Sequence, residues 1–80
     1  MAWFDCFWYD ENRDHLAQHG VTPEEFEYVV CHPKITGVSD SSGNPLVKGY
    51  TSTGRWLVCI YESIDDVSIL PVTAYEPTDE

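Results

Sequence analysis

The sequence predicts a small α+β domain in which an N-terminal strand and two short helices precede a mainly antiparallel sheet of about four strands, with the helices packed on one face. Two observations indicate this architecture. Helix-capping residues lie between residues 10 and 32, whereas short apolar runs separated by turn residues follow residue 33. In addition, residues 56–61 form the longest unbroken apolar run and are apolar on both alternating faces. Such a strand is covered on both sides, so residues 55–62 are expected to lie in the middle of the sheet.

The first predicted strand covers residues 3–9, a short stretch that is rich in aromatic side chains. A chain of 80 residues buries only about 60% of its unfolded surface, so its core must use large apolar side chains efficiently. We therefore expect four aromatic residues to belong to the core: Trp3, Phe7, Trp8 and Trp56.

The first predicted helix starts at Asp10, which offers an N-cap, and continues to about His19, where Gly20 suits the C′ position. One face of this helix combines a single leucine with an asparagine and two histidines at a spacing of four: Asn12, His15, Leu16 and His19.

The second predicted helix has the strongest local signal in the chain. Thr22 is its N-cap, Pro23 occupies its first position, and Glu25 completes a capping box with Thr22. The helix is expected to bury Phe26 together with a pair of valines. It is expected to end at His32, because the proline that follows disfavours a helical conformation there.

Four further strands are predicted after the helices, over residues 34–40, 46–51, 55–62 and 67–75. Pro71 lies inside the last of them and cannot donate a backbone hydrogen bond, so that strand is expected to lie at a sheet edge or to contain a bulge. Residues 1–75 are interpreted as a single domain and residues 76–80 as an acidic, disordered tail.

The chain is strongly acidic. Fourteen acidic residues against four basic ones give a formal net charge of −10. Such a surface repels nucleic acids and anionic membranes, so the favoured partner is a protein with a basic surface. No apolar run approaches the roughly 18 residues of a membrane span and no signal-like segment is present, so we expect a cytoplasmic protein.

Two groups of residues could carry chemistry, and both also have a structural interpretation. His15 and His19 have the spacing of two metal ligands on a helix, or they pack and donate hydrogen bonds near the helix C-terminus. The third ligand of such a site would come from Cys31, His32 or Cys59. Cys31 and His32 could form a nucleophile and its base, although neighbours on a helix point in different directions. We favour the structural interpretation in both cases and expect reduced thiols, no metal and no cofactor, because no second paired motif is present.

Four stretches carry a more specific pattern. Residues 8–12 are Trp-Tyr-Asp-Glu-Asn, residues 19–26 join the two helices, residues 48–58 contain Lys-Gly-Tyr-Thr and Gly-Arg-Trp-Leu, and residues 72–74 are Val-Thr-Ala. With these stretches the chain resembles, over roughly residues 7–75, the BrnT family of small bacterial toxins, whose hairpin motif is IGRT-x-DGR-x-L and whose closing strand contains ISAR. The resemblance implies a RelE-like fold, a metal-independent endoribonuclease activity, and neutralisation by a ribbon-helix-helix antitoxin.

The chain departs from this family where the chemistry should be. Tyr50 stands where the hairpin motif has a basic residue, Tyr75 stands where the closing strand has arginine, and residues 76–80 replace an Arg/Lys-rich helix. Metal-free cleavage of RNA needs a general base and cations that stabilise the developing charge. We therefore favour a diverged, non-catalytic protein-interaction module with a ribbon-helix-helix antitoxin-like partner. The alternative is an active endoribonuclease toxin of a type II toxin-antitoxin system, in which Lys48 and Arg55 stabilise charge and Tyr50 or Tyr75 donates a proton.

Overall fold

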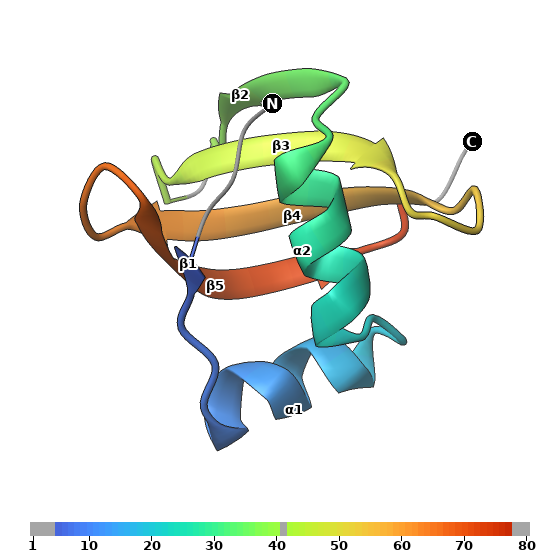
Figure 1. Cartoon of the computed structure of the whole chain (residues 1–80), viewed down its shortest axis with the longest axis horizontal. Helices are drawn as coiled ribbons and strands as arrows, with labels where there is room; N and C mark the ends of the chain where they lie inside the picture. Colours follow the sequence, from blue (N-terminus) through green and yellow to red (C-terminus); the bar gives the residue numbers. More distant parts are fainter. Residues whose placement is uncertain (1–4, 41, 78–80) are drawn as a thin grey trace.

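The computed structural model describes residues 5–40 and 42–77, which form two helices and one five-stranded mixed sheet (Figure 1). The sheet order is β1-β5-β4-β3-β2, with β1 parallel to β5 and all other neighbours antiparallel. The predicted α+β class is confirmed. The elements are β1 (Asp5–Cys6), α1 (Asp10–Gln18), α2 (Pro23–Cys31), β2 (Ile35–Val38), β3 (Pro45–Tyr50), β4 (Trp56–Ser63) and β5 (Ser68–Tyr75).

Strand β4 is the middle strand of the sheet, as its apolar run predicts. Leu57 and Cys59 point to the helix side and join one buried cluster with Leu16 of α1 and Phe26 of α2. Figure 1 shows α2 crossing this face of the sheet, whereas α1 lies beside β5. The helices therefore cover one face, and the residues of β4 that alternate with Leu57 and Cys59 point to the other.

The start of α2 has the predicted capping box. The Thr22 hydroxyl accepts a hydrogen bond from Glu25 N–H at 3.1 Å, and the Glu25 carboxylate accepts one from Thr22 N–H at 3.0 Å. Pro23 is the first helical residue, and Phe26 is fully buried together with Val29 and Val30. The helix ends at Cys31, with His32 as its C-cap.

Helix α1 begins differently from the prediction, because its N-cap is Tyr9 and Asp10 is already helical. The Asn12 side chain accepts a hydrogen bond from Tyr9 N–H at 2.9 Å. This bond places the N-cap at Tyr9, one residue before the predicted Asp10. The other end is as predicted. Gly20 adopts φ of 74°, and it and Val21 donate backbone hydrogen bonds into the last turn of α1, which is the Schellman arrangement.

Pro71 lies beside an irregularity in the β4–β5 ladder. Ile60 pairs with Thr73, but the next residue, Tyr61, pairs with Pro71, so Val72 is an extra residue on β5. The predicted bulge is therefore present. Strand β1 covers β5 only at Ser68 and Ile69, and α1 occupies the space beside the following part of β5.

The N-terminal strand is much shorter than predicted. Among the described residues it comprises Asp5–Cys6, and Phe7 N–H donates one further hydrogen bond to Ile69 O at 3.0 Å. The chain then turns toward α1, and this turn leaves Phe7 51% exposed, so the prediction that Phe7 belongs to the core is wrong. Trp8 is half-buried against Phe26, with ring centroids 5.6 Å apart, and Trp56 is half-buried on the sheet face away from the helices. Trp3 lies outside the described residues.

In the described part of the chain, no helix has the length and apolar character needed to cross a membrane. Glu76, which the sequence assigns to a disordered tail, is described and forms an ion pair with Arg55, whereas residues 78–80 lie outside the described residues.

Candidate functional site

The structure places Lys48 and Tyr75 together on the sheet face that the helices leave uncovered. Lys48 of β3 and Tyr75 of β5 both pair with Val58 of β4, so they lie on either side of it in one row. Gly49, next to Lys48, faces the helices, since a Cβ atom there would lie 3.3 Å from Val29 Cγ1, and Ala74, next to Tyr75, belongs to the buried core cluster. Lys48 and Tyr75 therefore point to the uncovered face, as strand alternation requires.

A depression with a volume of about 730 Å³ lies on this face. Lys48 and Tyr75 line it, together with Ile35, Leu46 and Ile60. His19 reaches its rim from the end of α1. An imidazole, a phenol and an ammonium group thus share one hollow, although the sequence assigned His19 only to a pair with His15.

Tyr50 lines a different hollow. Its ring packs edge-on against Trp56 at 4.7 Å between centroids. The hollow beside it has a volume of about 350 Å³ and also includes Lys34, Tyr28 and His32. The last two stack at 4.2 Å, and His32 Nδ1 lies 2.9 Å from the Tyr28 carbonyl oxygen. Tyr50 is therefore not grouped with Lys48 and Tyr75.

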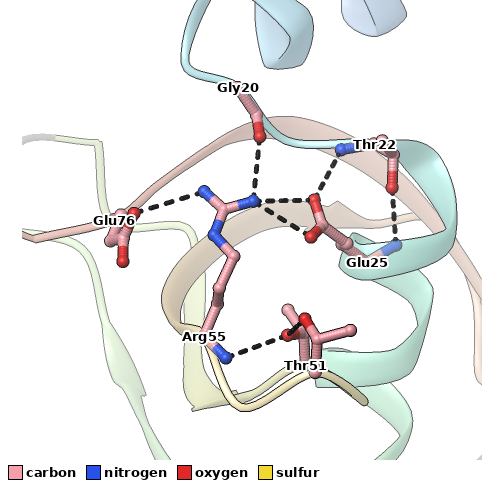
Figure 2. Close-up of polar contacts among 7 residues, drawn as sticks. Gly20, Thr22, Glu25, Thr51, Arg55 and Glu76 are labelled. Atoms are coloured by element: carbon pink, nitrogen blue, oxygen red, sulfur yellow. Dashed lines mark hydrogen bonds and ion pairs between the residues drawn. The ribbon is translucent and has the colours of Figure 1, made fainter.

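Arg55 points to the helix side and is held by three partners (Figure 2). Its Nη1 donates to the Gly20 carbonyl at 3.0 Å and to both oxygens of Glu25 at 3.0 and 3.1 Å, and its Nη2 donates to Glu76 at 3.3 Å. Burial acts against the charged form, but the hydrogen bonds and charges of Glu25, and then those of Glu76, raise the pKa of Arg55. This guanidinium therefore joins the junction of α1 and α2 to the β3–β4 turn and to the end of β5.

The β3–β4 turn positions this arginine through Thr51, which is 4% exposed. The Thr51 hydroxyl accepts a hydrogen bond from Arg55 N–H at 3.0 Å, and the two residues also share a backbone bond of 2.8 Å. Gly54 closes the turn with φ of 91°, a conformation that other residues rarely adopt. The Thr-Ser-Thr-Gly turn thus sets the direction of Arg55.

His15 and His19 lie with ring centroids 5.4 Å apart on the exposed side of α1. Within residues 5–40 and 42–77, no group of three His, Cys, Asp or Glu side chains is arranged to hold a metal ion. His15 instead lines a hollow of about 300 Å³ between α1 and β5.

We call that hollow the acidic groove and define it by five residues: Glu11, His15, Glu62, Leu70 and Val72. It exists because β1 ends at Cys6, so that the edge of β5 beyond it faces α1 instead of another strand. Glu62 of β4 and Glu11 of α1 meet in it from distant parts of the sequence. No signal in the sequence pairs these two residues, because Glu62 belongs to no motif and the stretch 8–12 that contains Glu11 points to no partner in β4.

The three cysteines are free thiols in the structure. Burial raises the pKa of Cys59 to about 12, with a smaller contribution from Cys6. Burial likewise raises the pKa of Cys6 to about 12, and the charges of Glu27, Cys31 and Asp5 add to the effect. A nucleophilic cysteine needs a lowered pKa, so neither of these two thiols has the properties of one.

We expect Cys6 and Cys59 to resist alkylation in the folded protein at neutral pH. A pKa near 12 leaves about a thousandfold less thiolate than the ordinary value of a cysteine, and only the thiolate reacts. Iodoacetamide labelling followed by mass spectrometry should leave both thiols unmodified in buffer and modify all three cysteines in urea. Labelling of Cys59 in buffer at the rate of an unstructured peptide would contradict the assignment.

No protein-family model matches the chain, and no curated protein and no solved structure matches it either. The resemblance to the BrnT family therefore stays a prediction.

Proposed function

We propose that the protein is a non-catalytic, cytoplasmic interaction module that binds a basic segment of another protein. The resemblance to BrnT toxins implies a ribbon-helix-helix antitoxin-like protein as this partner. The acidic groove is the part of the surface that we assign to the contact.

The observation that carries this proposal is the position of Arg55. The ribonuclease interpretation requires Lys48 and Arg55 as cations. Arg55 is bound within the fold to the carboxylates of Glu25 and Glu76 and to the Gly20 carbonyl. Lys48 shares its hollow with no second lysine or arginine of the described residues, since Lys34 lines another one. Stabilising a pentacoordinate phosphate requires several converging donors. The described surface does not gather them.

The acidic groove has the chemistry that a lysine or arginine side chain needs. Glu11 and Glu62 offer two carboxylates, and Leu70 and Val72 offer apolar surface for the aliphatic part of the incoming side chain. The net charge of −10 adds a long-range attraction that accelerates association with a basic partner.

We expect a fluorescent peptide rich in arginine and lysine to bind the protein, with an affinity that falls as salt is added. Changing Glu11→Gln and Glu62→Gln together should weaken binding by about tenfold, because two ion pairs at a partly exposed site are lost. Anisotropy titrations measure both effects.

The matched control is the pair Asp14→Asn and Glu24→Gln, which removes the same charge from exposed helix positions outside the groove. Equal losses in the two double variants would show that total charge and not the groove determines binding. Absence of any binding at low salt would contradict the proposed function itself.

One observation favours the alternative, an endoribonuclease toxin: His19, Lys48 and Tyr75 line the same depression. In that case His19 would act as the base, Tyr75 as the proton donor and Lys48 as the charge stabiliser. The test is incubation of the purified protein with RNA in EDTA. Cleavage that disappears in both Lys48→Ala and Tyr75→Phe would establish the alternative and overturn the interaction module, whereas intact RNA supports the module.

A further inference from the structure

Strand β2 ends the sheet with an open edge. It is last in the strand order, and within residues 5–40 and 42–77 no strand pairs with its outer side (Figure 1). Ser39 N–H donates to Asn44 O at 2.8 Å, and Gly37 and Ile35 follow in the same register against β3. Because hydrogen-bonding direction alternates in an antiparallel ladder, the N–H and C=O groups of Thr36 and Val38 point outward. Neither residue uses them in a turn or loop bond within the described chain.

Strand β2 is short, with four residues, but within these residues it lacks the other features that usually protect an edge strand. Natural edges carry a central charge, a proline or a bulge that prevents another strand from pairing. Strand β2 contains no charged residue and no proline, its register with β3 has no shift over Ile35–Val38, and Ile35 and Val38 are 50% and 64% exposed. Just before it, Lys34 N–H donates inward to Lys48 O at 3.0 Å, so the open edge consists of the residues Ile35–Val38. The nearest charges flank it and have opposite signs, Lys34 before it and Asp40 after it.

Gly37 at the centre of β2 has no explanation within its own chain. A Cβ atom there would meet nothing within 4 Å, and Gly37 is not among the glycines with positive φ. Glycine inside a strand weakens the strand, and it often marks a place where another backbone approaches closely.

We infer that β2 pairs antiparallel with β2 of a second copy of the chain, with the two-fold axis at Gly37. In this register Thr36 of each copy faces Val38 of the other, so the outward backbone groups bond to each other. The two glycines form the closely spaced central pair, where side chains would otherwise meet. Lys34 precedes β2 and Asp40 follows it in the β2–β3 turn, so the antiparallel arrangement brings Lys34 of each copy to the same end of the interface as Asp40 of the other, and an ion pair forms at each end.

The neighbouring registers lose these contacts. A shift by two residues places Lys34 opposite Val38 or Asp40 opposite Thr36, and both ion pairs disappear. A shift by one residue places a residue whose backbone N–H and C=O point outward opposite a residue whose backbone groups point toward β3. The register centred on Gly37 is thus the one in which backbone direction, glycine position and charge agree, and the interface is self-complementary, as a two-fold dimer requires.

The test is sedimentation velocity of the full chain over a wide range of concentration, at an ionic strength where the Debye length is about 8 Å, so that repulsion between the acidic surfaces is screened. The mass should rise from 9.1 kDa toward twice that value as concentration increases. Lys34→Asp and Asp40→Lys should each weaken the dimer about tenfold, because each change replaces two attractive cross-strand pairs with two repulsive ones.

An equimolar mixture of these two variants should dimerise again. In the mixed dimer, position 34 of each copy once more faces the opposite charge at position 40 of the other, so both end contacts are attractive. The matched controls are Arg13→Asp on the exposed side of α1 and Asp66→Lys in the β4–β5 turn, which make the same charge changes away from the edge and should leave the dimer constant of the wild-type chain unchanged. A chain that stays monomeric at every concentration, or a mixture that fails to restore the dimer, would overturn the inference.

Val38→Pro gives an independent test, because it removes an outward N–H group without removing a bond to β3. This variant should be monomeric with an unchanged circular dichroism spectrum, and a folded variant that still dimerises would also overturn the inference. If it does not fold, the charge variants decide. The edge is separate from the acidic groove, so failure of the dimer leaves peptide binding intact and can be distinguished from failure of the proposed function.

Discussion

The Asn12→Leu variant is expected to be about 3 kcal/mol less stable than the wild-type protein. Asn12 is 4% exposed and bonds to three backbone groups: its Oδ1 accepts from Tyr9 N–H, and its Nδ2 donates to Phe7 O at 2.9 Å and to Pro71 O at 3.3 Å. Leucine fills the space but leaves these groups without a partner. The loss comes from the three backbone groups that no longer have the Asn12 amide as a partner.

Urea unfolding followed by tryptophan fluorescence measures this change. The matched control is Gln18→Leu, which makes the same type of replacement at an exposed position of the same helix and should change the free energy of unfolding by less than about 0.5 kcal/mol. A loss below about 1 kcal/mol in Asn12→Leu would show that the network contributes little.

The Arg55→Met variant is expected to lose about 2 kcal/mol of stability. Methionine keeps most of the aliphatic part of the side chain but removes every hydrogen bond to Gly20, Glu25 and Glu76. The side chains of Arg55 and Glu25 are 31% and 22% exposed, so solvent screening keeps the loss below that of a fully buried ion pair.

Thermal and urea unfolding test this value. Arg13→Met serves as the control, because Arg13 is exposed on α1, and no ion pair is found for it among the described residues. Arg55→Lys should recover only part of the loss, since an ammonium group cannot reproduce the forked contact with Glu25. Equal free energies of unfolding for Arg55→Met and Arg13→Met would show that the contacts of Arg55 do not stabilise the fold.

The role of Arg55 also affects how activity data should be interpreted. A loss of function in an Arg55 variant could come from unfolding as easily as from missing chemistry. Lys48 and Tyr75 are better probes of ribonuclease activity, because no described ion pair or hydrogen bond of their side chains stabilises the fold.

The features that the sequence predicts correctly depend on neighbouring residues. The capping box of Thr22 and Glu25, the stop at Gly20 and the central position of β4 all follow from local capping, turn and alternation rules.

The features that escape prediction depend on distant contacts. In the sequence, Asn12 is part of a weakly apolar helix face, and only the fold brings Pro71 next to it. Arg55 has no local partner, because the two helices that supply Gly20 and Glu25 are placed only by the packing of the core. The same holds for the acidic groove, where Glu62 meets Glu11 only after α1 has docked on β5.

Glu25 couples local unfolding at the start of α2 to local unfolding of the β3–β4 turn. One of its oxygen atoms accepts both the Thr22 N–H that starts α2 and the guanidinium that extends from the β3–β4 turn. Fraying of the helix start therefore also releases the turn, since both depend on the same carboxylate. Local opening events in this region are coupled into one cooperative unit that spans the helix pair and the sheet, and its amide hydrogens should exchange with solvent together and not element by element.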